Sequence, residues 1–121
     1  MKTAYNKWLE TCTAAEGIRD RFGCEAAFDY LIGEKLMNLI DLNWNTDEYA
    51  RELPRYVAAA QTVFDAGEFE RFLPKLEAAL KEEANAIDEL PADELVSAFR
   101  TLNRRLAHYN KIRTLVKAAN A

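Results

Sequence analysis

The side chains best suited to chemistry lie together near the C-terminus. The segment FRTLNRRLAHYNKIR, from Phe99 to Arg113, contains the only histidine of the chain, His108, among five arginines and lysines and no carboxylate. An imidazole that moves a proton beside guanidinium groups that hold phosphate oxygens is a combination used in phosphoryl transfer. Arginine also binds phosphate without any reaction, through paired hydrogen bonds. The segment therefore indicates two alternatives, a nuclease and a surface for a phosphate-bearing or acidic partner.

The sequence NRRLAHY within this segment superficially resembles the Arg-x(4–6)-His motif of the HEPN ribonucleases, which are small helical bundles. The resemblance implies His108 as the general base and an arginine as the group that stabilises the transition state. The spacing does not match, because Arg104 and Arg105 precede His108 too closely and Arg100 is too far from it. We therefore expect no catalytic residue here, and we expect His108 to be an ordinary surface histidine.

The other templates for catalysis and metal binding are absent from the sequence. A single histidine without a Glu-x-x-His pair does not fit a di-iron bundle, and a chain without Cys-x-x-Cys lacks the common zinc spacing. There is no phosphate-binding Walker loop and no Gly-x-Ser-x-Gly elbow. The sequence predicts a protein that is not an enzyme, with no metal site and no cofactor.

A helix that we expect over about 92–118 places the cationic segment. On a wheel of about 100° per residue, Leu95, Phe99 and the later apolar residues form a stripe that faces the core. The cations lie about 140–220° away, on a surface that we call the basic ridge. With Lys117 added near the end of the helix, its members are Arg100, Arg104, His108, Lys111 and Lys117.

Three interpretations of the basic ridge remain open. The first is a solvated face whose cations favour the negative end of the helix dipole. The second is packing beside acidic helices, such as the segment 81–89. The third is a binding surface for nucleic acid or an acidic protein, which the net charge of −4 for the whole chain opposes at long range.

Helical spacing of apolar residues recurs along the whole chain, and no segment shows the alternation of a strand. The expected helices cover about 4–21, 25–43, 45–64, 68–87 and 92–118. Pro91 suits a helix start, whereas Pro54 and Pro74 either begin helices or kink them. The predicted fold is all-α: a single domain, 1–121, formed by an antiparallel bundle of four to five helices around a central apolar helix, 25–43.

This central helix is apolar around most of its circumference. One arc belongs to the core, and a second face continues it with Tyr30, Gly33, Met37 and Trp44. Either neighbouring helices of the same chain cover this second face, or a second copy of the chain does, in a homodimer. Gly33 costs about 1 kcal/mol against alanine inside a helix, so either another backbone approaches closely there, or the glycine is tolerated and has no role.

The composition favours a cytoplasmic protein that does not bind membranes. No apolar run reaches the roughly 20 residues that span a bilayer, and the N-terminal residues lack the apolar part of a secretion signal. Cys12 and Cys24 are too far apart on the expected helices to form a disulfide, so two free thiols are expected. These features agree with a reducing compartment.

The function that these features favour is a small intracellular interaction protein without enzymatic activity. It would bind a protein partner, or itself, through its helix faces. The alternative is a regulator associated with nucleic acid that uses the basic ridge, whose phosphate contacts would make binding strongly dependent on salt.

Overall fold

The computed structural model describes residues 3–43, 47–65 and 67–119, with the side chains of 42, 43 and 47–50 outside the described part. Within these ranges the chain is an all-α helical bundle without strands, as predicted. The elements are α1 (Ala4–Phe22), α2 (Cys24–Phe28), η1 (Asp29–Leu36), α3 (Met37–Asn43), α4 (Asp47–Gln61), α5 (Glu68–Ala86), η2 (Ile87–Glu89) and α6 (Ala92–Ala119).

Local signals in the sequence set most of the helix ends. The Thr3 hydroxyl accepts a hydrogen bond from the Asn6 backbone N–H and so caps α1. Gly23 and Gly67 have φ values of 97° and 85°, a region that glycine enters without strain, and they stand between α1 and α2 and before α5. The Pro91 carbonyl accepts the first backbone hydrogen bonds of α6, from Glu94 and Leu95.

Pro54 and Pro74 lie inside α4 and α5, which decides the alternative that the sequence left open. Neither proline begins a helix. Both prolines are exposed, and the large residues beside them in the sequence, Leu53 and Leu73, are buried. A proline removes one backbone hydrogen bond and bends a helix interior, and at these positions its ring faces solvent rather than the core.

The helix expected over 25–43 runs through α2, η1 and α3, and its middle part, η1, is a π-helix. Hydrogen bonds that close over five residues put more residues into each turn than the 3.6 of an α-helix. The element packs against α1, α5 and α6. Its buried apolar side chains include Phe28, Leu31, Ile32, Leu36, Met37 and Ile40.

The core is one connected cluster of apolar residues from α1, α2–α3, α4, α5 and the second half of α6. Trp8 anchors α1 in it, because the indole N–H donates to the Tyr56 carbonyl over 3.0 Å and the two rings stack. At the other end of α4, the rings of Phe28, Phe64 and Phe69 meet edge to face. These aromatic contacts tie α1 to α4, and they tie α2 and the residues after α4 to α5.

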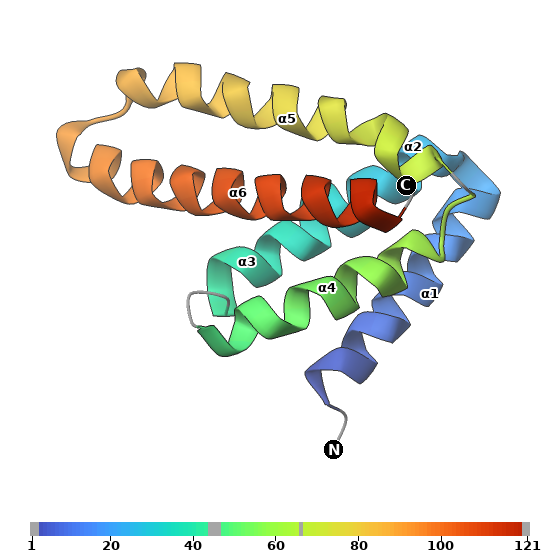
Figure 1. Ribbon diagram of the computed structural model, residues 1–121. Helices are drawn as coiled ribbons and strands as arrows, with labels where there is room; N and C mark the ends of the chain where they lie inside the picture. The colour runs from blue at the N-terminus through green and yellow to red at the C-terminus, as the bar shows by residue number, and fades with distance from the viewer. Residues whose placement is uncertain (1–2, 44–46, 66, 120–121) are drawn as a thin grey trace.

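The last two long helices, α5 and α6, run antiparallel and form a hairpin (Figure 1). The end of the hairpin near the C-terminus lies over the other helices, whereas the turn between α5 and α6 extends beyond α3 and α4 in this view (Figure 1). Burial along the chain agrees with this picture, because no residue from 81 to 101 is buried. We call residues 81–101 the hairpin tip.

Candidate functional site

The basic ridge does not form one exposed surface. Arg100, Lys111 and Lys117 are exposed, but Arg104 is half-buried and its Nη1 donates to the Asp41 carbonyl over 3.3 Å. His108 is only 8% exposed. Whether the three exposed cations bind a partner stays a prediction.

The expectation that His108 is a surface histidine was wrong. Its Nδ1 carries the proton, because it lies 2.7 Å from the Arg104 carbonyl, which can only accept a hydrogen bond. Burial lowers the pKa of His108 below its usual value, and the nearby charges of Lys111 and Arg104 lower it further, against the opposing effect of that hydrogen bond. The reason for the error is that α6 packs against α3 and α4 as well as α5, so its second half is enclosed beyond one stripe.

The expectation for Phe99 was wrong in the opposite sense. We placed it on the stripe that faces the core, yet its side chain is 54% exposed. Leu102 and Tyr109 on the same stripe are buried, so the periodicity itself was correct. Phe99 is exposed because it lies on the hairpin tip, where no other helix covers α6.

The described residues on the second face of the central helix differ in their exposure to solvent. Met37 is 3% exposed and already belongs to the core, so its side chain cannot serve a dimer contact. Tyr30 is half-buried, with the Lys35 ammonium 5.4 Å from its ring centroid. No atom beyond the nearby backbone of its own helix lies within 4 Å of a Cβ placed on Gly33, so no other described part of the chain approaches closely there, which agrees with the alternative of a tolerated glycine. Trp44 lies outside the described residues.

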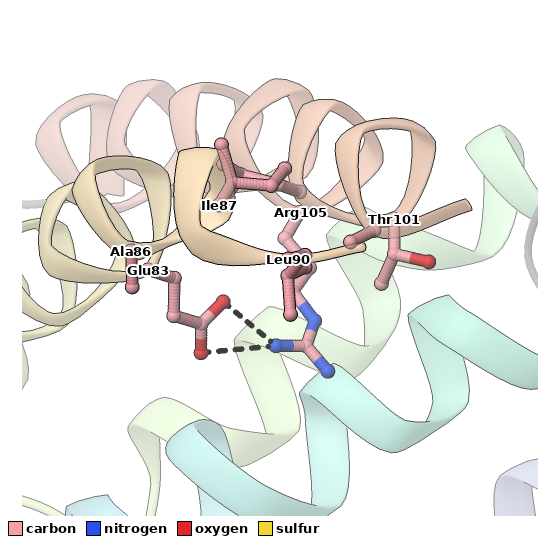
Figure 2. A pocket seen from close by; sticks show the side chains of 8 residues that line it. Glu83, Ala86, Ile87, Leu90, Thr101 and Arg105 are labelled. Atoms are coloured by element: carbon pink, nitrogen blue, oxygen red, sulfur yellow. Dashed lines mark hydrogen bonds and ion pairs between the residues drawn. The ribbon is translucent and has the colours of Figure 1, made fainter. Parts of the chain in front are cut away.

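A side-chain cluster that the ridge did not include joins three helices around Arg105. Its Nε and Nη2 donate to the Asp41 carboxylate of α3, with the shortest distance 2.5 Å, from Nη2 to Oδ2. Its Nη1 donates to both oxygens of Glu83 on α5, at 3.2 and 3.0 Å (Figure 2). These hydrogen bonds, led by those to Asp41, raise the pKa of Arg105. The interpretation that α6 packs beside the acidic segment 81–89 is therefore confirmed at this residue.

Two cavities meet at this cluster. The outer cavity, of about 340 Å³, lies between the end of α5 and the first half of α6 (Figure 2). The inner cavity, of about 250 Å³, lies between α5 and the central helix. Glu83 and Arg105 line both. The outer cavity is also lined by Ala86, Ile87, Leu90, Ala98, Thr101 and Leu102. The residues that line the inner cavity include Gly33, Met37, Lys75, Leu76 and Leu80.

The two cavities follow one another along α5 and share Glu83 and Arg105. The α5 and η2 positions that line them are 75, 76, 79, 80, 83, 86 and 87, with 90 just beyond, and 76, 80, 83 and 87 among them follow at spacings of four and three that put them on one helix face. From 75 to 90 they extend over about 22 Å at 1.5 Å per residue. Together we call them the α5 groove.

The hairpin tip has three exposed large apolar side chains, of which Leu90 lines the outer cavity, whereas Val96 and Phe99 line neither cavity. Leu90, Val96 and Phe99 are 37%, 56% and 54% exposed, and all three lie within ten residues of one another. Acidic residues surround them along the chain, with no lysine or arginine between 82 and 99. The six acids are Glu82, Glu83, Asp88, Glu89, Asp93 and Glu94. The hairpin tip thus combines exposed apolar side chains with an acidic rim.

The polar groups that the two cavities share are few. The single histidine lines neither of the two cavities, and the polar groups shared by both are an arginine and a carboxylate that bond each other. Within the described ranges, no three His, Cys, Asp or Glu residues are grouped to hold a metal ion, and no helix is long and apolar enough to cross a bilayer.

The contacts of Arg105 with Asp41 and Glu83 were not predicted from the sequence. A signal for Arg105 was present, because it lies about 80° from Leu95 on the wheel, at the edge of the apolar stripe rather than opposite it. A charged residue at such an edge commonly pairs across a helix interface. No pattern in the sequence pointed to Asp41. Comparisons of the chain with protein-family models, with curated proteins and with solved structures gave no match.

Proposed function

We propose that the protein is an interaction module without enzymatic activity, and that it binds a protein partner with the hairpin tip and the adjoining α5 groove. The observation that carries the proposal is the burial pattern: no residue from 81 to 101 is buried, although Leu90, Val96 and Phe99 are large and apolar. Single exposed apolar residues are common on protein surfaces. Several exposed apolar residues in one region that also has an apolar cavity are typical of a docking surface.

Binding of nucleic acid is the less favoured function. Arg104, Arg105 and His108 engage groups of the chain itself, so the exposed cations of the basic ridge are reduced to Arg100, Lys111 and Lys117. The acids of the hairpin tip would repel a polyanion at the other end of the same helix. The cytoplasm is the proposed location, since Cys12 and Cys24 are free thiols, as expected.

The experiment compares two exposed phenylalanines. A photo-crosslinking phenylalanine analogue replaces Phe99 in one variant and Phe22, which is 74% exposed at the end of α1, in the other. After irradiation in the native host, we expect crosslinked partners from position 99 that are missing from position 22. The same crosslinks should disappear when Ala98→Trp fills the outer cavity. Equal crosslinking from both positions, or crosslinks that survive the filled cavity, would refute the proposal.

A further inference from the structure

We propose that the segment that docks on the hairpin tip is an amphipathic helix of the partner with basic residues beside its apolar face. The inference rests on the proposed function, because it names the occupant of the same site. It follows from three features of the hairpin tip: the helical walls of the groove, the acidic rim, and the different burial of the two carboxylates that hold Arg105.

The walls of the α5 groove favour a helix. The walls of the outer cavity are α5, η2 and α6, and a third helix laid along them would cover the cavity together with the exposed side chain of Leu90. The groove length of about 22 Å corresponds to about 15 residues of helix. A partner that adds a β-strand would need a sheet edge, and the described residues contain no strand.

The rim selects basic flanking residues. Six carboxylates and no lysine or arginine lie between 82 and 99, so the apolar surface is framed by a net charge of −6 over that range. Lysine or arginine residues of the partner would meet these carboxylates at the edge of the contact, where charges guide association and exclude acidic competitors. An acidic helix with the same apolar face would be repelled.

Glu83 is the residue of the acidic rim that would pair with a lysine or arginine of the partner. Its side chain is 50% exposed, whereas Asp41 is 20% exposed and Arg105 is 24% exposed. Arg105 keeps the Asp41 carboxylate when Glu83 turns away, so Glu83 is the carboxylate available to a cation of the partner. Asp41 holds Arg105 in place, and Glu83 distinguishes basic partners from acidic ones.

The experiment uses three labelled peptides of about 15 residues, a length that spans the groove. The first has leucines at helical spacing flanked by lysines, the second replaces the lysines with glutamates, and the third scrambles the first. Fluorescence anisotropy measures their affinity for the full chain, and amide chemical shifts locate the binding. We expect the lysine peptide to bind at least roughly tenfold more tightly than either control, as two or three rim ion pairs would give.

Variants separate the tip from the rest of the surface. Leu90→Ser should weaken the lysine peptide because Leu90 lines the outer cavity, and the control Phe22→Ser should not. Glu83→Gln should reduce the preference for lysine over glutamate while leaving the scrambled peptide unchanged. Circular dichroism checks that each variant is folded, and Ala98→Trp, which fills the outer cavity, replaces Leu90→Ser if the latter unfolds.

Several results would overturn the inference. They are the absence of binding by the lysine peptide, equal affinity for the glutamate or scrambled peptide, shifts outside residues 81–101 and the α5 groove, and a dimer in light scattering that Leu90→Ser dissociates. If crosslinks from position 99 persist in any of these cases other than the dimer, the docking surface stands and only its occupant was misassigned. Loss of the position-specific crosslinks would instead remove the proposed function itself.

Discussion

The hydrogen bonds of Arg105 allow a prediction with a magnitude. Arg105 donates to Asp41 through Nε and Nη2 and to Glu83 through Nη1, so one side chain holds two carboxylates in different surroundings. Double-mutant cycles measure the two couplings separately. The cycles use Arg105→Ala with Asp41→Ala, and Arg105→Ala with Glu83→Ala. Loss of the packing of the arginine stem occurs in both cycles and cancels.

Burial sets the expected sizes. The Arg105 and Asp41 side chains are 24% and 20% exposed, so their paired, charge-assisted hydrogen bonds are largely removed from solvent. A coupling of about 1.5–3 kcal/mol is expected for hydrogen bonds to a charged group in such a place. Glu83 is 50% exposed, and screening by water reduces its coupling to about 0.5 kcal/mol. Arg105→Ala alone should cost about 2–3 kcal/mol, because it also leaves Asp41 without its partner.

Urea unfolding followed by circular dichroism gives the free energy of unfolding for the wild type, the three single variants and the two double variants. Repeating the series at about 0.5 M salt should reduce the Glu83 coupling and leave most of the Asp41 coupling, since buried pairs are screened less. A Glu83 coupling equal to or above that of Asp41 would refute the reasoning. It would also remove the basis for treating Glu83 as the carboxylate that a partner can take.

Three further predictions concern other parts of the chain. Gly33→Ala should raise the free energy of unfolding by about 0.5–1 kcal/mol in urea titrations, because the added methyl meets open space and alanine loses less backbone entropy; destabilisation would show that the π-helix needs glycine. Cys24, which is half-buried, should react with Ellman's reagent before Cys12, which is 5% exposed and whose pKa burial raises to about 11; equal rates would contradict this order. Folding lowers the pKa of His108, so the unfolded chain binds the proton first, and the free energy of unfolding should fall as the pH drops below about 6.5. His108→Gln should flatten that part of the profile of stability against pH, and an unchanged slope would show that other groups cause the fall.

The helices could be predicted from the sequence because their signals are local. The expected segment 68–87 compares with α5 at Glu68–Ala86, and the expected segment 92–118 with α6 at Ala92–Ala119. Gly67, with its positive φ, and Pro91, before the first turn of α6, mark these starts without reference to any neighbour. The start of the third expected helix, at residue 45, falls outside the described residues.

The faces of the helices were harder to predict because they depend on neighbours. A wheel of 3.6 residues per turn assumes one geometry, and the π-helical η1 changes the angular relation between Gly33, which lies inside it, and Met37, which follows it. His108 and Phe99 lie on one helix, yet their burial is the reverse of the expectation. The turns of α6 before Leu102 have no buried residue, whereas later turns also contact α3, as the hydrogen bonds of Arg104 and Arg105 to Asp41 show. Periodicity carries no information about which turns of a helix have a second neighbour.

The candidate site could be predicted only in part for the same reason. The absence of acids after Glu94 left packing beside an acidic helix as one of three interpretations, and the contact between Arg105 and Glu83 agrees with that interpretation at this residue. The α5 groove itself requires three elements to meet, and neither the Asp41 contact nor the two cavities have a signature at fixed spacing. Exposure of Leu90 and Phe99 could not be read from residue type, because leucine and phenylalanine at helical spacing are typical of a core.

Arg105 lies where the α5–α6 hairpin changes from a part without buried residues to a part that enters the core. On the side of the C-terminus, Tyr109, Ile112 and Val116 enter the core, and these turns of α6 are held by three helices. On the other side, from 101 back to 81, no residue is buried, so substitutions there remove little packing. Apolar residues in such a region add nothing to the core and favour aggregation unless something covers them. A bound helix would give them a role, and it would do so without altering the part of the hairpin that stabilises the fold.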